Sequence, residues 1–350
     1  MPSGGEHSST VREGRAGQQI GRAAGPVRRG IGIVGVPIWH GQPNPGTQWA
    51  PKRLRETGVI GGLQRLGWHV NDYGDLQFIT FQDDIAYEPN AIYNPRTVGD
   101  ATRKIAAAVR RSLQDNGISL NIGGDHSMTI GTFHAHAQVF DKPCLVWVDA
   151  HADINTAASS VSGHIHGMPV AFMLHETSGL CNVLPGFEWC RPSLTAKDVV
   201  YIGLRDIDPP EWDIIDRLGI TYFDMKSIDQ LGIAAVIKKA LDAVNPNRDR
   251  PIHLSFDVDG LDTLEAPSTG TPVPGGMKLS EAVYIGEQLH KTGMLTCLDL
   301  AEINPDIGSA SDQKRTLYAA RTIIEACFGK KTLDAALASE NGVGLIDYHM

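Results

Sequence analysis

The sequence has little that would suit a secreted, membrane-bound or nucleic-acid-binding protein. It has only five cysteines in 350 residues, an odd number without a Cys-x-x-Cys pair, which predicts free thiols rather than a disulfide framework. No apolar run reaches the roughly 18 residues of a membrane span, and no hydrophobic signal segment is present. Basic residues number 31 against 40 acidic ones and form no long run. These absences predict a cytoplasmic protein that binds neither nucleic acid nor membrane.

The first 29 residues differ in composition from the rest of the chain. They are rich in Gly and Ser and hold five arginines but only two acids. Only Val11, Ile20 and Val27 are large and apolar there, which is few for the amphipathic helix of a mitochondrial presequence. We therefore predict a disordered tail over residues 1–29. The alternative is a transit peptide, which would make the protein mitochondrial.

Short apolar runs alternate with amphipathic stretches from residue 30 onward. The stretches 99–117 and 233–244 have helical patterns. The apolar runs lie at 30–37, 118–124, 144–153, 198–206, 251–262 and 294–305. Nearly all-apolar strands that alternate with helices predict a predominantly parallel sheet covered on both faces, within one α/β domain over residues 30–350. In such sheets ligands bind beyond the carboxyl ends of the strands.

Metal-ligand side chains follow three of these runs. They occur in "GGDHS", "VWVDAHADINT" and "SFDVDGLD", and they are His126, Asp149, His151, Asp153, Asp257 and Asp259. Alternate residues of a strand face the same side, so Asp149, His151 and Asp153 converge if the extended conformation persists to residue 153. Four carboxylates on one patch repel each other unless cations lie among them. Oxygen-rich ligands favour Mn2+ or Mg2+, with zinc or cobalt as alternatives, and two divalent ions would suit a cationic substrate.

The positions and roles of the other histidines are predicted from the residues around them. His134 and His136 lie two apart on an expected helix, and we predict that both are surface residues. His164 and His166 lie on a glycine-rich loop, "SGHIHGMP", just after the 144–153 run. A proton shuttle could lie there, and His166 is the better candidate.

These motifs together resemble those of a known family. "GGDHS", "DAHADIN", "SGHIHG", "GLRDID", "SFDVDGLD", "STGTPVPGG" and "EINP" resemble the ureohydrolases, and within them the arginases, from about Ile31 to about Asp347. The resemblance implies a three-layer α/β/α sandwich on a predominantly parallel eight-stranded sheet. It also implies a binuclear manganese centre and a homotrimer.

The resemblance implies a role for each matching residue. One ion would bind His126, Asp149, Asp153 and Asp257, and the second would bind His151, Asp149, Asp257 and Asp259. The catalytic set would be His166 as proton shuttle, Glu302 as guanidinium anchor and Asp153. The substrate contacts would be Asn155 and Ser162 on the α-carboxylate, Asp208 and Glu211 on the α-amino side, and His164, Thr271 and Glu302.

The implied reaction is hydrolysis of the C–N bond of L-arginine to L-ornithine and urea, as in arginine metabolism and the urea cycle. Paired ions would lower the pKa of a bound water, so that hydroxide attacks the guanidinium carbon while a general acid protonates the leaving amine. The first alternative is an agmatinase or another guanidino-substrate ureohydrolase. The second is a metal-free regulatory pseudoenzyme. A single-zinc deacetylase on the related fold would leave His126 and Asp259 without a role.

One position departs from the arginase pattern. Where arginases usually carry Asn in "SGNxHG", this chain has His164. We expect this imidazole to lie near the substrate's α-amino group, which it could contact as a hydrogen-bond acceptor only when neutral.

Overall fold

The computed structural model describes residues 30–331 except 85, 88–90 and 182. The predicted tail at 1–29 therefore lies outside the described residues, as do the last residues of the predicted domain, 332–350. Within the described part of the chain, no helix is both long enough and apolar enough to cross a membrane.

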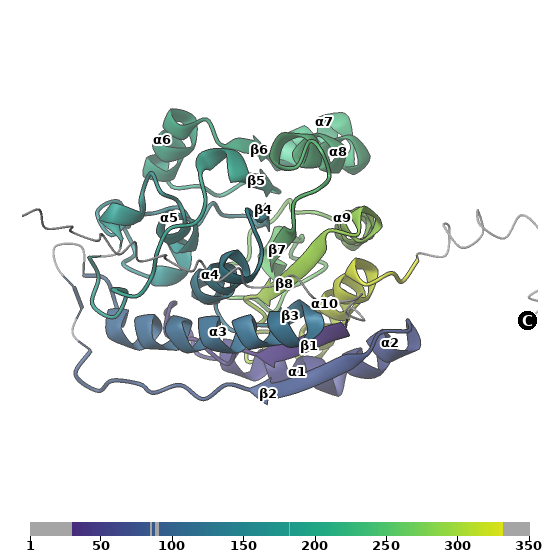
Figure 1. Cartoon of the computed structure of the whole chain (residues 1–350), viewed down its shortest axis with the longest axis horizontal. Helices are drawn as coiled ribbons and strands as arrows, with labels where there is room; N and C mark the ends of the chain where they lie inside the picture. The colour runs from purple at the N-terminus through teal and green to yellow at the C-terminus, as the bar shows by residue number, and fades with distance from the viewer. Residues whose placement is uncertain (1–29, 85, 88–90, 182, 332–350) are drawn as a thin grey trace, which may run out of the picture.

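One sheet of eight strands runs through the molecule in the order β2-β1-β3-β8-β7-β4-β5-β6 (Figure 1). All neighbouring strands pair in parallel. The strands are β1 Gly30–Gly35, β2 Val70–Asp75, β3 Gly117–Ile122, β4 Cys144–Val148, β5 Val199–Ile202, β6 Thr221–Phe223, β7 Ile252–Asp257 and β8 Leu295–Ala301. The predicted sheet type is confirmed. Five strands lie inside predicted runs, and β3 begins one residue before the run at 118–124.

Helices cover both faces of this sheet (Figure 1). One hydrophobic cluster joins the sheet to α3 Pro95–Asn116, α4 Thr129–Val139, α5 Pro169–Met173 and α6 Pro209–Leu218. The other joins it to α1 Ala50–Glu56, α2 Val59–Arg65, α7 Met225–Leu231, α8 Ile233–Val244, α9 Leu279–Thr292 and α10 Ala310–Cys327. The helices predicted at 99–117 and 233–244 are α3 and α8. The three-layer sandwich is confirmed.

Short 3-10 helices occur mainly in the connections. They are η1 Thr47–Trp49, η2 His126–Met128, η3 Ile165–Gly167, η4 Ser178–Leu180, η5 Ala196–Asp198 and η6 Val258–Gly260. Three of these short helices, η2, η3 and η6, carry predicted site residues.

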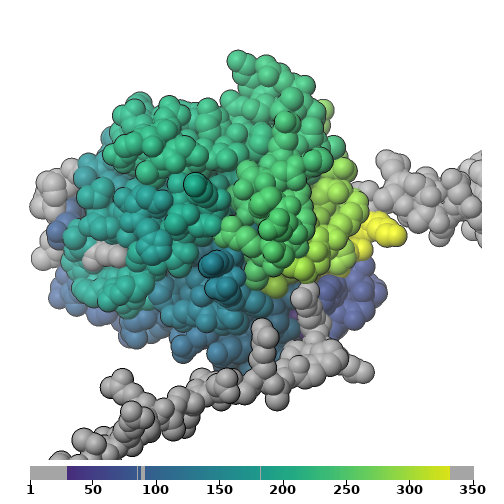
Figure 2. All heavy atoms as spheres, turned by 45° about the horizontal axis from the view of Figure 1, so that its top comes forward, coloured from purple at the N-terminus to yellow at the C-terminus, as the bar shows by residue number. Residues whose placement is uncertain are grey.

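In the space-filling view, the green segments around α7 and α8 lie beside the teal segments that follow β4 (Figure 2).

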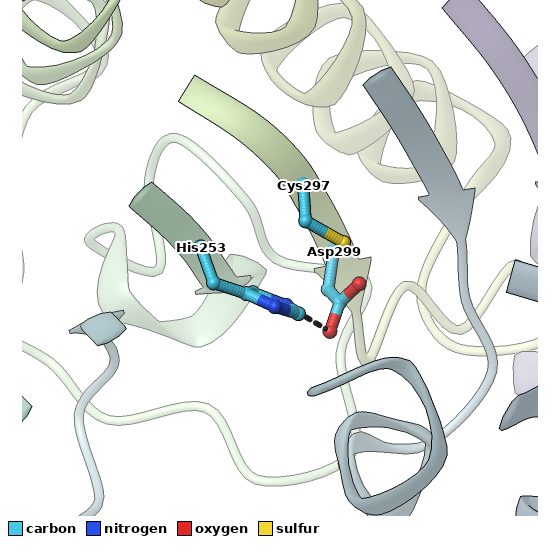
Figure 3. A group of neighbouring side chains, drawn as sticks. All are labelled: His253, Cys297 and Asp299. Atoms are coloured by element: carbon cyan, nitrogen blue, oxygen red, sulfur yellow. Dashed lines mark hydrogen bonds and ion pairs between the residues drawn. The ribbon is translucent and has the colours of Figure 1, made fainter. Parts of the chain in front are cut away.

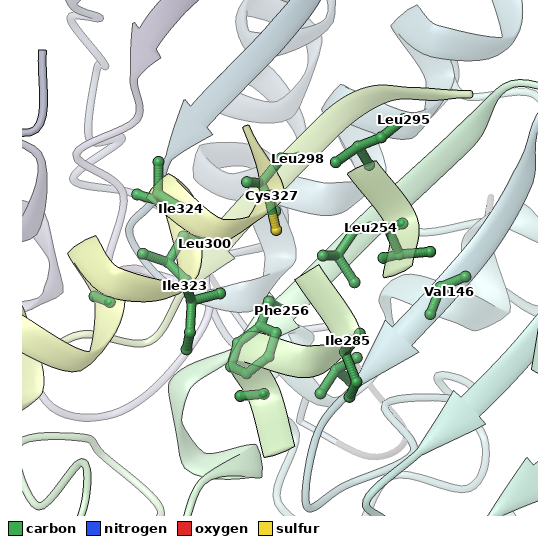
Figure 4. Close-up of a cluster of buried hydrophobic side chains, with 14 of the residues drawn as sticks. Val146, Leu254, Phe256, Ile285, Leu295, Leu298, Leu300, Ile323, Ile324 and Cys327 are labelled. Atoms are coloured by element: carbon green, nitrogen blue, oxygen red, sulfur yellow. The ribbon is translucent and has the colours of Figure 1, made fainter. Parts of the chain in front are cut away.

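The strand β7 shows why polar groups gather at one place in this core. Leu254 and Phe256 pack against α9 and α10 in a buried apolar cluster (Figure 4). Side chains alternate along a strand, so His253, Ser255 and Asp257 project to the opposite face. All residues of β7 are buried, and these three polar side chains therefore need partners inside the protein.

Candidate active site

Six predicted ligand residues converge at the carboxyl ends of β4 and β7, and we call them the active-site cluster. They are His126, Asp149, His151, Asp153, Asp257 and Asp259. His126 Nδ1 lies 3.1 Å from Asp149 Oδ2 and 3.1 Å from Asp257 Oδ2. The same atom lies 3.3 Å from Asp153 Oδ2. His151 Nδ1 lies 3.4 Å from Asp149 Oδ1 and 3.2 Å from Asp259 Oδ2. Two groups that could each hold a metal ion therefore share Asp149.

The loop geometry that assembles this cluster differs from the prediction. The strand β4 ends at Val148, so the expectation of an extended conformation through residue 153 is wrong. Instead, Asp149 turns its own loop by accepting a hydrogen bond from the His151 N–H (2.7 Å). Asp257 does the same with the Asp259 N–H (2.9 Å). Short Asx turns after adjacent strands thus place alternate side chains around a common centre.

The electrostatics of the active-site cluster indicate a deficit of positive charge. Burial raises the pKa of Asp153 to about 6, and the neighbouring Asp149 contributes. Burial also raises the pKa values of Asp257 and Asp259, together with their carboxylate neighbours. Burial lowers the pKa of His126, but the surrounding carboxylates outweigh it and raise that pKa well above its usual value. Protons thus accumulate where divalent cations would fit.

The histidine His126 supplies a direct test of that fit. Its Nδ1 is buried and, despite three carboxylate oxygens nearby, has no well-aligned hydrogen bond within the described residues. Three carboxylate oxygens thus lie near His126 Nδ1 without forming a hydrogen bond to it. Ligands that converge on one bound ion have the same arrangement. The donor set is oxygen-dominated with two imidazoles, which suits hard divalent cations.

Glu302 and His166 form a pair beside the cluster. Glu302 Oε1 accepts hydrogen bonds from the His126 backbone N–H (2.9 Å) and from His166 Nδ1 (3.1 Å). Burial lowers the pKa of His166, but the hydrogen bond and charge of Glu302 raise it to about 9. His166 is therefore protonated at neutral pH and can act as a general acid.

Two of these site residues have left-handed backbone conformations. The φ angles are 49° at Asp153 and 61° at Glu302, the residue that follows β8. This conformation costs a non-glycine residue about 1–3 kcal/mol and is typical of functional sites.

A cavity of about 280 Å³ opens above the cluster. Its walls include ten of the predicted residues, namely His151, Asp153, Asn155, Ser162, His164, His166, Asp208, Glu211, Asp257 and Thr271. His126, Asp149, Asp259 and Glu302 do not line it and are buried. All the predicted substrate contacts except Glu302 thus lie on the walls. Three of the six predicted ligands line the cavity, and the other three are buried below it.

The helix α6 begins beside the cavity and positions two carboxylates. Asp208 is its N-cap residue, and the Glu211 side chain accepts from the backbone N–H of Asp208 in a capping box. Asn155 Nδ2 donates to Asp208 Oδ2 (3.0 Å), so an amide donor and a carboxylate lie side by side. Burial, with Asp153 nearby, raises the pKa of Glu211 to about 8. This arrangement offers contacts for both charged groups of an amino-acid head.

His164 and Thr271 also line the cavity. His164 lines the cavity and stacks on Tyr93, with ring centroids 5.1 Å apart and an interplanar angle of 28°. Burial and the nearby His166 lower the pKa of His164, which favours the neutral imidazole. Thr271 Oγ1 donates to Asp259 Oδ2 (2.9 Å), so it contacts a predicted ligand as well as the cavity.

Two residues at this site were not among the predicted site residues. Asp125 accepts from the Gly41 N–H (2.9 Å) and so holds the loop after β1 beside η2. Asp206 lines the cavity and lies 3.8 Å from His151 Nε2. Both residues lie inside motifs that carry the resemblance, "GGDHS" and "GLRDID". Their place in these motifs is the signal from which a site role could have been predicted.

The prediction that His136 is a surface residue is wrong. His134 is only partly exposed on α4, but His136 is fully buried, and its Nε2 lies 2.8 Å from Thr296 Oγ1. The helix packs against both α3 and the sheet, so its buried surface is wider than one stripe.

The fold and the cluster define a class: α/β/α proteins with a histidine–carboxylate metal-binding site at the carboxyl edge of a parallel sheet. Comparison with known proteins narrows it. The Arginase family model matches residues 29–329, and the chain belongs to this family. Arginase-1 from Rattus norvegicus is 45% identical over 302 residues, which are 86% of this chain and 93% of that protein.

Solved structures agree with this assignment. The arginase from Bacillus caldovelox has a TM-score of 0.79 and 33% identity, covering 87% of this chain and 100% of that one. The arginase from Entamoeba histolytica, in complex with L-ornithine, has a TM-score of 0.76 and 29% identity, covering 87% and 99%. The resemblance expected from the motifs is confirmed.

Proposed function

We propose that this protein is an arginase that hydrolyses L-arginine to L-ornithine and urea. The observation that carries the proposal is the pair of histidine–carboxylate groups joined by Asp149 below a cavity whose wall carries Asn155 and Asp208 side by side. The paired histidine–carboxylate groups suit attack on a guanidinium group. The amide and carboxylate on the cavity wall suit binding of an α-amino acid. Family membership supports the same reaction.

The proposed cofactor is two Mn2+ per chain. We assign His126, Asp149, Asp153 and Asp257 to one ion, and His151, Asp149, Asp257 and Asp259 to the other. The raised pKa values of Asp153, Asp257 and Asp259 support cation binding, because a divalent ion would replace the protons that the cluster attracts. Bound divalent ions would supply a water of lowered pKa as the nucleophile.

The remaining roles are carried by side chains of this chain. Glu302 would hold the guanidinium, since its carboxylate is buried next to His166 and the His126 backbone. His166 would donate a proton to the leaving amine from its Nε2, because its Nδ1 contacts Glu302. Glu302 would thus position the cationic end of the substrate, and His166 would protonate the amine, which leaves poorly without a proton.

The opposite end of the substrate would meet polar groups on the cavity wall. Asn155 and Ser162 would donate to the α-carboxylate, while Asp208 and Glu211 would accept from the α-amino group. His164 and Thr271 complete the proposed contacts. Neutral donors paired with carboxylates favour a zwitterionic head over agmatine, which has no α-carboxylate to receive the donors.

The test measures urea release from L-arginine and from agmatine, with and without Mn2+ preincubation. Mn2+-dependent release from L-arginine, with little from agmatine, is expected. Preference for agmatine would favour the agmatinase alternative. No release from either, together with no bound metal in the purified protein, would favour the regulatory pseudoenzyme.

The assembly and location of the protein stay predictions. We propose a cytoplasmic homotrimer acting in arginine metabolism, with a mitochondrial location as the alternative if the first 29 residues are a transit peptide. Analytical ultracentrifugation and localisation of a tagged full-length chain test these two points.

A further inference from the structure

A second buried cluster of metal-ligand side chains lies on the strands next to the active site. We call it the Asp299 cluster, and it consists of His253 on β7 with Cys297 and Asp299 on β8. All three side chains are fully buried. His253 and Asp299 point toward each other from their adjacent strands, with Nε2 2.9 Å from Oδ2 (Figure 3). By residue type and distance this cluster could hold a metal ion.

Its hydrogen bonds argue that it holds no ion. Asp299 accepts from Asn121 Nδ2 (2.7 Å), from the hydroxyls of Thr129 (3.0 Å) and Thr132, and from His253. Three of these donors go to Oδ2 and Asn121 goes to Oδ1, so both carboxylate oxygens are already bonded. Burial raises the pKa of the Cys297 thiol well above its usual value, so no thiolate is available. Asp299 is therefore held in a hydrogen-bonded network, although His253 Nδ1 has no partner among the described residues.

This network connects to the active-site cluster through two hydroxyl groups. Thr129 Oγ1 lies 2.9 Å from Ser255 Oγ, and Ser255 Oγ lies 2.8 Å from His126 Nε2. The chain of contacts therefore runs from Asp299 through Thr129 and Ser255 to the imidazole of a proposed metal ligand. Both hydroxyls are fully buried, which leaves them dependent on these partners.

The direction of each hydrogen bond in this chain follows from the charge of Asp299. Burial raises the pKa of Asp299, but His253 and the surrounding donors outweigh it, so the carboxyl is ionised and can only accept. The single hydroxyl proton of Thr129 must then point to Asp299. Ser255 must in turn donate to Thr129, since Thr129 has no second proton.

The same reasoning reaches the metal ligand. With its proton directed to Thr129, Ser255 can only accept from His126 Nε2, which must carry a hydrogen. We propose that Asp299 is a positioning residue that acts through Thr129 and Ser255 to hold His126 in the Nε2–H tautomer, with the Nδ1 lone pair directed at the metal site. The proposal deepens the assignment of His126 as a metal ligand and rests on the proposed function.

The surroundings of His126 agree with this role. Its ring stacks on Trp147 with centroids 4.0 Å apart and an interplanar angle of 15°, which holds the ring plane. Its Nδ1 faces Asp149, Asp153 and Asp257 at 3.1 to 3.3 Å. If the chain of hydroxyls reversed, Ser255 would donate to Nε2, and Nδ1 would carry the hydrogen and lose its capacity to bind an ion.

Two threonines of α4 provide a matched test. Thr129 and Thr132 are both fully buried, and both donate to Asp299 Oδ2, but only Thr129 also contacts Ser255. Thr129→Val and Thr132→Val each remove one hydroxyl without a large change in shape, so both should lower Tm by similar amounts. We expect only Thr129→Val to weaken binding of one of the two Mn2+ ions, by roughly 10- to 100-fold.

The measurement is Mn2+ binding to the metal-stripped full-length protein, followed by equilibrium dialysis and by electron paramagnetic resonance of free Mn2+. Ser255→Ala interrupts the chain at its other end and should give the same loss as Thr129→Val. Thr129→Ser keeps the hydroxyl and should restore the affinity, which a purely structural role of the methyl group would not predict.

Equal weakening of Mn2+ binding in both valine variants, or unchanged binding in Thr129→Val, would overturn the proposal. Since the readout is metal affinity, it is separate from arginine turnover. A protein that binds Mn2+ with this dependence on Thr129 but releases no urea would retain the inference and lose the proposed function. Urea release with a Thr129-independent affinity would do the reverse.

Discussion

The active-site cluster and the Asp299 cluster both combine histidine with aspartate, are largely buried and share the strand β7. In the active-site cluster, four aspartates face two histidines, and burial with neighbouring charge raises the pKa of Asp153 to about 6. Burial also raises the pKa of Asp149, but the two histidines outweigh it and lower that pKa, so two histidines serve only part of the four carboxylates. In the Asp299 cluster, one aspartate has four donors, and its pKa is lowered despite burial. The balance of donors and carboxylate oxygens therefore distinguishes a cation site from a structural network more clearly than residue type does.

The largest effect should come from removing the carboxylate that both proposed metal sites share. Asp149→Asn should lose at least one Mn2+ and reduce arginine turnover by about a thousandfold or more, because the bound ions contribute several kcal/mol to the transition state. Metal content by elemental analysis and urea release measure both effects. If the variant kept two ions and most of its activity, Asp149 would not be a shared metal ligand, and the active-site cluster would not differ from the Asp299 cluster as a cation site.

Replacing Glu302 should separate substrate binding from metal binding. Glu302→Gln should keep both Mn2+ ions but lose arginine turnover by a factor of about a hundred or more, since breaking a buried charge pair costs about 3–5 kcal/mol. Glutamine keeps an oxygen that can accept from the His126 N–H, so the loop should hold its position. Loss of metal from this variant would contradict the role assigned to Glu302.

The sequence predicted the sheet type, six strand positions and all six residues of the active-site cluster. It did so partly for the wrong reason, since β4 ends at Val148 and Asp153 reaches the site through a left-handed backbone. The edge strands β2 and β6 went unpredicted as apolar runs because their residues are mostly exposed or only partly buried. Alternating periodicity identifies which residues face the same way but not where a strand ends.

The Asp299 cluster could not be predicted from the sequence. Asp299 contacts Thr129 and Asn121, which lie 170 and 178 positions away. Its role depends on the direction of each hydrogen bond, and these directions exist only once the strands and α4 have packed. The prediction for His136 was wrong for the same reason, because its burial results from the packing of α4 against both α3 and the sheet.

The pH dependence of stability should distinguish the clusters in the metal-free protein. A carboxyl whose pKa is raised by folding ionises more readily in the unfolded chain. Asp153, raised from 3.8 to about 6, and Glu211, raised from 4.5 to about 8, should therefore lower the free energy of unfolding as pH rises from about 4 to 8. The raised pKa of His126 acts in the same direction, since its contribution is full below pH 6.5 and is lost as pH rises further.

Asp299 should act in the opposite direction, because its lowered pKa gives stability that is present above pH 3.8 and lost as pH falls below it. Urea denaturation at several pH values, with EDTA or with Mn2+, measures both behaviours. We expect a decline of the order of a few kcal/mol toward high pH in EDTA and a smaller decline with Mn2+, because the ions would replace protons on the proposed ligand Asp153 but not on Glu211, which is not a proposed ligand. Parallel profiles in the two conditions would show that the active-site cluster needs no cation.

The smallest effect concerns His164, the departure from the arginase pattern. Its imidazole lines the cavity, stacks on Tyr93 and has its centroid 6.2 Å from that of His166. A neutral ring can accept a hydrogen bond from the substrate's ammonium group, whereas a protonated ring would repel it.

Because the pKa of His164 is lowered from 6.5, protonation and weaker arginine binding should begin below that pH. The wild-type KM should therefore rise between about pH 6.5 and 5 by up to roughly tenfold, the equivalent of one hydrogen bond. His164→Asn should show only the change due to metal loss, which both proteins share and which Mn2+ content measured at each pH would reveal. If the two KM profiles stay parallel over this range, His164 does not contact the α-amino group.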